Sequence, residues 1–310
     1  MLWNDKPYHS LDYEMKKQYG EKVYKLSVNA GMTCPNRDGT LGVGGCIFCS
    51  EGGSGDFAAR GESVREQLER GMTFFRGKNV GRLFIAYFQA FTNTYAPVDR
   101  LEALYREALD VENIAGISIA TRPDCLGDEV LALLERLKSE YADKFIWVEL
   151  GLQTTNEAAA LLIRRGYKLG VFDDAVKSLR GIGIPIIAHV ILGLPYETRA
   201  DMLATCKYLA DMRIDGVKLQ LLHVLKNTPL AELCERGTFE TLGFDEYVDI
   251  VISCLEILPP DTVIHRVTGD GARKLLIAPL WSTDKRRVLN TLQGEMKRRG
   301  TFQGIMYPHV

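Results

Sequence analysis

Three closely spaced cysteines are the strongest chemical signal in the sequence. Cys34, Cys46 and Cys49 lie in the segment CPNRDGTLGVGGCIFC, on a glycine-rich loop, with eleven and then two residues between them. Three thiolates on such a loop can close on one metal centre. Structural zinc takes four protein ligands, and no second Cys or His pair lies nearby in the sequence. Three thiolates suit a [4Fe–4S] cluster with one iron left open; a zinc site is the alternative.

Six β-branched or apolar segments must position this loop, and amphipathic stretches of helical length lie between most of them. Strands that alternate with helices indicate parallel βαβ units whose helices cover the sheet. The predicted strands are Val23–Asn29, Leu83–Phe88, Gly116–Ala120, Phe145–Leu150, Ile184–Leu192 and Val217–Leu222. This pattern predicts an α/β fold, with a barrel or partial barrel favoured over a two-layer sandwich.

Polar residues lie within or just after several predicted strands, where ligands of an open α/β barrel bind. Arg122 could hold a carboxylate through two hydrogen bonds, although a surface pair with Asp124 is the alternative. Glu149 interrupts the apolar segment WVELGLQT, and a carboxylate buried there needs partners. His189 lies in the fifth strand, where a histidine is more often a satisfied core residue than a catalyst.

Taken together, the cysteine loop and five further segments resemble the radical S-adenosylmethionine (SAM) superfamily over nearly the whole chain. These segments are YFQAFTNTY, TRPD, VELGLQT, HVILGLP and HRVTGDG. The long first gap resembles the elongator-protein-3-like branch, and within it a bacterial subfamily with the C-x11-C-x2-C motif. The resemblance implies a radical SAM partial (β/α)6 TIM-like barrel, a [4Fe–4S] cluster on Cys34, Cys46 and Cys49, and SAM at the open iron.

The resemblance also implies the SAM contacts. Arg165 matches the family arginine that binds the SAM carboxylate, with Arg164 as the register alternative, and a ribose hydroxyl or the SAM ammonium is the expected partner of Glu149. Gln89 and Ala90 replace the glycine-rich turn of the family, so either backbone or the Gln89 side chain makes that contact. The expected contacts are Phe48, Gln89, Ala90, Thr121, Arg122, Glu149, Gln153, Arg165, His189, Leu192 and Leu222.

The implied reaction begins when one electron from the cluster breaks SAM into methionine and a 5′-deoxyadenosyl radical. Elongator-like relatives act on wobble uridines, which suggests tRNA as a partner. The resembled subfamily implies remodelling of 5-carboxymethylaminomethyl-2-thiouridine toward the aminomethyl form. A flavodoxin or a ferredoxin is the kind of electron donor that such chemistry needs. A radical SAM enzyme of a small molecule or peptide, and a non-catalytic zinc-binding RNA module, are the alternatives.

Charge is unevenly distributed along the chain, although the formal net charge of its 310 residues is only −2. Residues 262–310 hold nine basic and three acidic side chains, a net +6, with Trp281, Phe302 and Tyr307 interleaved. Basic patches supply phosphate affinity, and a solvated basic helix face is the alternative. The RNA-binding candidates are Lys285, Arg286, Arg287, Lys297, Arg298 and Arg299.

The chain is predicted to comprise an N-terminal extension (1–22), a radical SAM partial barrel (23–261) and a basic C-terminal extension packed on it (262–310). Its 46% apolar and 25% charged residues are ordinary for a globular protein. No apolar stretch approaches the roughly 20 residues needed to cross a bilayer, and the N-terminus lacks a signal-peptide pattern. We therefore expect a cytoplasmic protein with no membrane partner.

Overall fold

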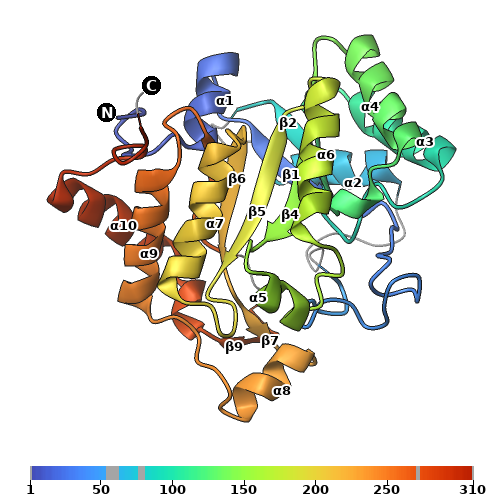
Figure 1. Ribbon diagram of the computed structural model, residues 1–310. Coiled ribbons are helices and arrows are strands. Elements are labelled where there is room, and N and C mark those ends of the chain that lie inside the picture. The colour runs from blue at the N-terminus through green and yellow to red at the C-terminus, as the bar shows by residue number, and fades with distance from the viewer. Residues whose placement is uncertain (1, 54–62, 76–80, 270–272, 309–310) are drawn as a thin grey trace.

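A curled sheet of seven parallel strands forms the centre of the molecule (Figure 1). The computed structural model describes residues 2–53, 63–75, 81–269 and 273–308. The strand order is β1-β2-β3-β4-β5-β6-β8. The strands are β1 (Tyr24–Val28), β2 (Phe84–Phe88), β3 (Ile114–Thr121), β4 (Phe145–Gln153), β5 (Ile186–Leu192), β6 (Gly216–Leu221) and β8 (Val263–Arg266). All six predicted strands are confirmed, in sequence order across the sheet.

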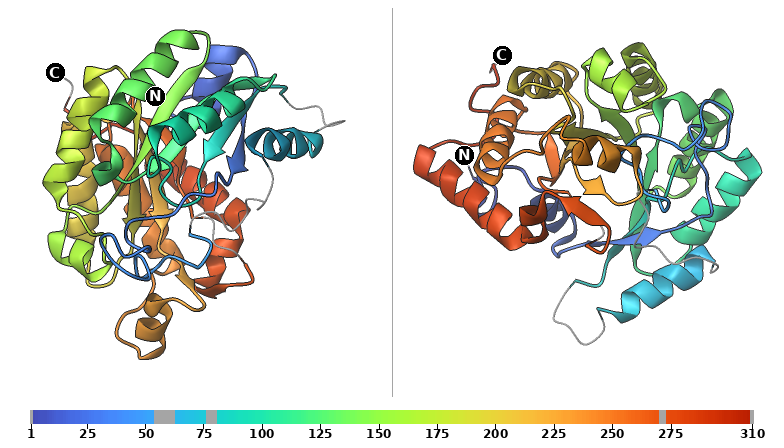
Figure 2. Two further views of the ribbon diagram at one scale, coloured as in Figure 1. Left: turned by 90° about the vertical axis from the view of Figure 1, so that its right-hand side faces the viewer. Right: turned by 90° about the horizontal axis from the view of Figure 1, so that it is seen from below.

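The helices between the strands cover the outer face of this sheet, and the view from below shows the strands curling into an open barrel (Figure 2). They are α2 (Val64–Thr73), α3 (Val98–Leu109), α4 (Asp128–Glu140), α5 (Glu157–Leu162), α6 (Leu169–Gly181), α7 (Arg199–Asp211) and α9 (Phe244–Ile257). The prediction of a partial TIM-like barrel is confirmed.

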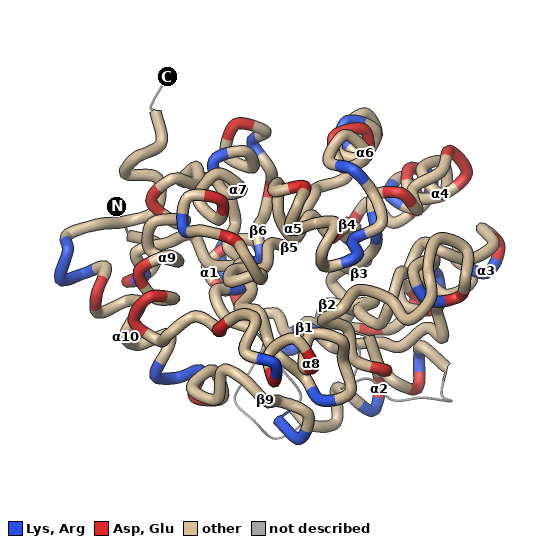
Figure 3. The backbone as a smooth tube through the Cα atoms, turned by 60° about the horizontal axis from the view of Figure 1, so that its bottom comes forward, with Lys and Arg blue, Asp and Glu red and all other residues tan. Residues whose placement is uncertain are grey.

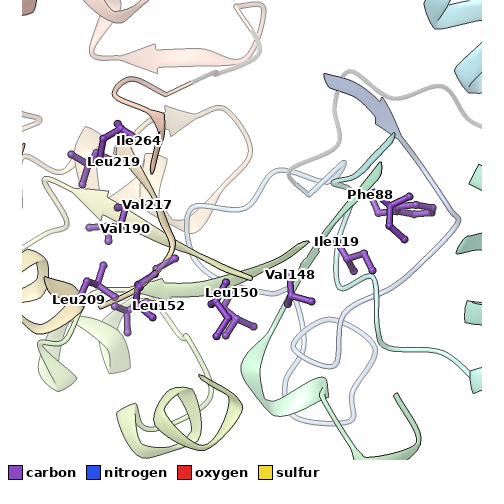
Figure 4. Close-up of a cluster of buried hydrophobic side chains, with 14 of the residues drawn as sticks. Phe88, Ile119, Val148, Leu150, Leu152, Val190, Leu209, Val217, Leu219 and Ile264 are labelled. Carbon is purple, nitrogen blue, oxygen red and sulfur yellow. The ribbon is translucent and has the colours of Figure 1, made fainter. Parts of the chain in front are cut away.

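Alternation along the strands separates the core from the barrel interior. In β5, Val190 and Leu192 belong to the main core between sheet and helices, whereas His189 and Ile191 line a cavity on the inner side. Successive side chains of a strand point to opposite faces, so the two sets cannot exchange without a register shift. Figure 4 shows part of the core, in which Phe88, Ile119, Val148 and Val190 come from different strands.

The amino ends of the strands are closed by α1 (Leu11–Tyr19). Met15 of this helix is 1% exposed and packs in a small cluster with Val23, Ile85 and Ala115. The Ser10 side chain caps the helix by accepting a hydrogen bond from the backbone N–H of Tyr13, as is common at helix starts. One end of the barrel interior is therefore filled with apolar side chains, which leaves the carboxyl ends of the strands for ligands.

The C-terminal segment contributes to the sheet as well as packing on it. Strand β8 pairs with β6, so the first residues of the predicted extension at 262–310 join the barrel. A two-stranded antiparallel pair, β7 (Val224–Leu225) and β9 (Leu276–Ala278), lies beyond, with α8 (Pro229–Glu235). Helix α10 (Lys285–Arg299) packs against α9. Because it supplies β8, this segment is part of the wall around the barrel interior.

Candidate active site

One cavity of about 260 Å³ opens at the carboxyl ends of the strands, and most of the predicted site residues line it. Figure 3 shows the charged residues of the chain with this side of the molecule turned forward. The predicted residues in its lining are Cys34, Cys46, Phe48, Cys49, Gln89, Thr121, Arg122, Glu149, Gln153, Arg165, His189 and Leu222. Residues more than 180 positions apart in the sequence are thus brought to one place.

Two of the predicted SAM contacts do not line this cavity. Ala90 and Leu192 are both 0% exposed. Leu192 points into the core between the sheet and the helices, next to Val190. Strand alternation turns the Leu192 side chain outward. Neither side chain belongs to the site proposed below, and a contact through the backbone of these residues stays a prediction.

The cysteine loop is held in a defined shape by Arg37. Its guanidinium donates to the backbone carbonyls of Cys49, at 3.2 Å, and of Ser50, while its own backbone N–H donates to the Cys34 carbonyl at 2.8 Å. Gly45 has φ +81°, and a Cβ there would lie 2.8 Å from the Arg37 side chain. A glycine is therefore required for the loop to close over Arg37.

Asn36 joins the same loop to the segment after α5. Its side-chain amide donates to the Arg164 carbonyl at 2.6 Å and approaches the Cys46 sulfur at 3.6 Å. Gly166 has φ +85°, and a Cβ at this position would come 2.7 Å from the Asn36 amide oxygen. Residue 166 must therefore be a glycine for the chain to pass this close to Asn36. The sequence motifs did not single out Asn36.

The three thiols line one cavity and fit the donor set of a [4Fe–4S] cluster. The backbone N–H of Cys49 donates to the Cys46 carbonyl at 3.0 Å, so the C-x-x-C turn is formed. A hydrogen bond from the Cys49 thiol lowers the pKa of Cys46 to about 7. An iron–sulfur cluster bonds its cysteines through different iron atoms, so thiols around one cavity wall match that donor set.

Glu149 is the centre of a buried polar network on the inner face of the barrel. Its carboxylate is 0% exposed. One oxygen accepts from Lys25, at 2.8 Å, and from Ser118, at 2.6 Å; the other accepts from His189, at 2.7 Å, and from Lys218. Burial opposes ionisation, but Lys218 and then Lys25 outweigh it and hold the pKa of Glu149 well below its usual value.

The sequence demanded a partner for the buried Glu149, and its expected contact with SAM stays a prediction. Four protein donors already satisfy the carboxylate, so the partner that the sequence demanded is supplied by the protein. Sequence reasoning missed Lys25 and Lys218. The available signal was a lysine inside each of the strand segments YKLSV and GVKLQL, because an ammonium in a buried strand also needs a partner.

Arg165 and Arg122 are likewise committed to protein groups. Arg165 is 2% exposed and donates to the carbonyls of Leu152, Thr154 and Tyr167 and to the Glu157 carboxylate. It therefore fixes the turn after β4. The guanidinium of Arg122 makes the pair with Asp124 that is the alternative to a ligand carboxylate, through two hydrogen bonds at 2.9 and 2.7 Å, and also donates to the Arg165 carbonyl at 2.8 Å. The two side chains are 10% and 17% exposed, so the pair is mostly buried rather than on the surface.

The polar groups that remain in the lining come from the strand ends. Gln89 accepts a hydrogen bond from Ser27 at 2.8 Å, and Thr121 bonds to Thr94 at 2.5 Å. Gln153 has φ +67°, which interrupts the pairing of β4 with β5 and turns the chain at the cavity wall. Phe48 packs beside Ile47 and Leu222 in an apolar cluster. The cavity lining thus combines polar groups from the strand ends with an apolar patch.

The six basic RNA-binding candidates fall into two groups at opposite ends of α10. At 1.5 Å per residue the helix is roughly 20 Å long. Lys285, Arg286 and Arg287 form its first turn, and Lys297, Arg298 and Arg299 its last. All six are exposed. Among the interleaved aromatics, Trp281 packs on Phe244 and Tyr247 and is partly buried.

Lys285, the first residue of the first-turn group, lies near the cavity lining. His223 and Arg266 line the cavity, and the charge of Lys285 adds to burial in lowering the pKa of His223 to about 4. The last-turn group is partly neutralised, because Arg298 and Arg299 pair with Glu295 and Arg299 also pairs with Asp249. In the described part of the chain, no helix has the length and hydropathy of a membrane span.

Comparison with known proteins agrees with this geometry. The family model of the radical SAM superfamily matches residues 33–209, and the model of the radical SAM C-terminal domain matches residues 214–298. The uncharacterized protein YtqA of Bacillus subtilis is 44% identical over 99% of this chain and 94% of its own length. Protein YhcC of Escherichia coli K12 is 35% identical over 88% of this chain and 86% of its own.

More distant similarity reaches the elongator proteins. Elongator complex protein 3 of Dictyostelium discoideum is 28% identical over 54% of this chain and 29% of its own length. The solved structure of the archaeal Elp3 of Methanocaldococcus infernus superposes with a TM-score of 0.66 at 16% identity, over 91% of this chain and 64% of that one. The family implies a [4Fe–4S] cluster and SAM. The chain belongs to the radical SAM superfamily.

Proposed function

We propose that this protein is a radical SAM enzyme that modifies the wobble uridine of tRNA, by remodelling 5-carboxymethylaminomethyl-2-thiouridine toward its aminomethyl form. The observation that carries the proposal is the convergence of Cys34, Cys46 and Cys49 on a cavity with a polar wall, in a chain similar to Elongator complex protein 3. The same proposal places the protein in the cytoplasm, with a flavodoxin or a ferredoxin as electron donor.

The cysteine loop is the proposed holder of the cluster. Cys34, Cys46 and Cys49 would ligate three irons, while Arg37 and Asn36 keep the loop against the barrel. When bound, a [4Fe–4S] cluster supplies the electron that splits SAM into methionine and a 5′-deoxyadenosyl radical, and the protein provides binding and orientation. For this role, the cysteine loop must be rigid and its thiols must face the cavity.

The cavity walls are the proposed SAM site. Gln89, Thr121 and Gln153 supply hydrogen-bonding groups, and Phe48 and Leu222 supply apolar surface. Such a combination of an apolar wall and a few placed polar groups is typical of cofactor sites. The apolar wall also keeps water from a reactive radical, which would otherwise be lost in side reactions.

The first turn of α10 is the proposed tRNA contact nearest the cavity. Lys285, Arg286 and Arg287 are basic residues at the positive end of a helix dipole, an arrangement that an isolated helix disfavours and that phosphate groups would relieve. The charge of Lys285 acts on the cavity-lining residue His223, and Arg266 acts on Lys285 in turn, so a backbone phosphate at this turn would lie near the cavity while the base enters it.

The test begins with cofactor chemistry. The chain reconstituted with iron and sulfide without oxygen, then given dithionite and SAM, should produce 5′-deoxyadenosine. Cys46→Ser and Cys49→Ser should abolish that product, and Cys234→Ser, a free cysteine outside the cavity lining, should leave it unchanged. Well-loaded protein that makes no 5′-deoxyadenosine contradicts the enzyme proposal, and bound zinc without iron or sulfide supports the RNA-module alternative.

The substrate is tested by mass spectrometry of tRNA nucleosides. Incubation with tRNA from a strain that lacks this gene should convert 5-carboxymethylaminomethyl-2-thiouridine to the aminomethyl nucleoside. Active SAM cleavage with no change in any tRNA nucleoside would instead favour a small molecule or a peptide as substrate.

Salt dependence tests the tRNA surface. Replacing Lys285, Arg286 and Arg287 by Gln should lower the slope of log Kd against log salt concentration by about 2. Each lost phosphate contact lowers this slope by roughly 0.7 to 0.9. The matched control replaces Lys297, Arg298 and Arg299, which carry the same formal charge at the far end of the same helix. Equal effects of the two triple variants would contradict a contact at the cavity side.

A further inference from the structure

The inner face of the barrel carries a layer of polar side chains around Glu149. Every strand of the main sheet contributes a member, and β8 contributes two. They are Lys25, Tyr87, Ser118, Glu149, His189, Lys218, His265 and Arg266. Within this layer His189 is placed to act on a ligand, because it lines the cavity while one of its ring nitrogens is bound to Glu149.

The position of the proton on His189 follows from its neighbour. Nε2 of His189 lies 2.7 Å from a carboxylate oxygen of Glu149. Lys25 and Lys218 both bond to this carboxylate, so Glu149 is ionised and has no hydrogen to donate. A hydrogen bond between an imidazole nitrogen and a bare carboxylate needs the proton on the nitrogen. Nε2 therefore carries the hydrogen.

The imidazole also remains neutral. Burial and the charge of Lys218 lower the pKa of His189 to about 4, against the opposing effect of Glu149. Tyr87 and Ser118 add no charge to the layer, and His265, whose own pKa burial and Lys25 hold well below its usual value, adds none at neutral pH. A neutral ring with its one proton on Nε2 has a bare lone pair on Nδ1.

That lone pair is available to a ligand. No hydrogen bond joins Nδ1 of His189 to another described residue, and the atom is not enclosed, since the side chain is 16% exposed and lines the cavity. A lone pair attracts N–H and O–H groups and repels carboxylate and phosphate oxygens. This point of the cavity wall therefore selects a hydrogen-bond donor.

We propose that Nδ1 of His189 accepts a hydrogen bond from an N–H group of the modified uridine, held in that state by Glu149. The donor is the side-chain amine or the ring imide of the base, and this inference rests on the proposed tRNA substrate. His189 is accordingly a substrate-binding residue, and Glu149 is a positioning residue that acts through it. The Lys25–Glu149–Lys218 network then has a purpose, which is to keep the carboxylate ionised inside the barrel.

The first test is an NMR measurement of the tautomer. The reconstituted full-length protein, labelled with ¹⁵N at histidine, should show His189 as the neutral Nε2–H form at neutral pH. Ser118→Ala removes one bond to Glu149 but leaves both lysines, so the tautomer should persist. Glu149→Gln removes the charge that fixes the proton and should mix the two tautomers. A neutral Nδ1–H form in the unaltered protein overturns the proposal.

The second test identifies the donor. An anticodon stem-loop RNA with 5-carboxymethylaminomethyl-2-thiouridine should shift the Nδ1 resonance of His189. If the shift persists when the RNA carries plain 2-thiouridine, the donor is the ring imide. If the shift disappears with that RNA, the donor is the side-chain amine. A shift produced by SAM alone, or RNA binding that leaves Nδ1 unchanged, overturns the proposal. RNA that does not bind at all overturns the proposed function and this inference together.

Affinity gives a third measurement that does not depend on the label. His189→Gln keeps an acceptor oxygen and His189→Leu does not, so the Gln variant should bind the modified RNA about three- to tenfold more tightly, the value of one hydrogen bond. Circular dichroism checks that both variants are folded. Equal affinities of the two folded variants contradict a hydrogen bond to the substrate.

Discussion

The pH dependence of stability is the sharpest consequence of the buried His189. Its pKa is about 4 in the folded chain against 6.5 when unperturbed. Between pH 6.5 and pH 4 the residue is protonated in the unfolded chain but not in the folded chain, so the stability of the fold decreases as the pH falls. The linkage relation gives a loss of about 2 kcal/mol between pH 7 and pH 5 from this residue alone, and about 3 kcal/mol in full.

His189→Gln isolates this contribution. The glutamine amide can still donate to Glu149 but does not titrate, so the variant should lose about 2 kcal/mol less than the unaltered chain between pH 7 and pH 5. Urea denaturation followed by circular dichroism at several pH values measures the free energy of unfolding for both proteins. The comparison cancels the titration of all other groups, and Lys297→Gln, at an exposed position, serves as the control for a general effect of substitution.

The reasoning is refuted if the plots of unfolding free energy against pH run parallel for the two proteins. If the unaltered chain and His189→Gln lose the same free energy between pH 7 and pH 5, the ring is not held neutral by its surroundings. The inference about Nδ1 would then lose its electrostatic support, although the contact with Glu149 would stand.

Three further substitutions test the cysteine loop, the turn held by Arg165, and Glu197, a carboxyl outside the cavity lining that accepts a hydrogen bond from Thr154. Gly45→Ala should lower the iron bound per chain, because its Cβ would lie 2.8 Å from Arg37; unchanged iron content means that the loop adapts. Arg165→Met should destabilise the chain by about 3 kcal/mol or more, because the carbonyls of Leu152, Thr154 and Tyr167 lose their donor, and the midpoint of urea unfolding measures this. Burial raises the pKa of Glu197 to about 7, so its ionisation destabilises the folded chain as the pH rises. Glu197→Gln should therefore become more stable than the unaltered chain between pH 5 and pH 8, by about 3 kcal/mol in full. A difference in the free energy of unfolding that does not change with pH contradicts that pKa.

Local patterns in the sequence determined the framework of this protein. Each predicted strand is an apolar segment that needs no knowledge of its neighbours, and the alternation with helices fixes parallel connections. Cys34, Cys46 and Cys49 likewise lie within one loop, so a donor set could be predicted without the fold. The seventh strand, β8, was missed because its four residues are too short and too polar to stand out.

The tertiary structure alone decided what the polar residues do. Glu149 and Arg165 were singled out for their chemistry, yet whether such a group meets a ligand or a protein partner depends on residues far away in the chain. Lys218 bonds to Glu149 although the two are 69 positions apart in the sequence. Arg165 donates to backbone carbonyls, whose positions cannot be read from a sequence. The split of the basic tail has the same cause, because only a formed helix places Lys285 and Lys297 at opposite ends.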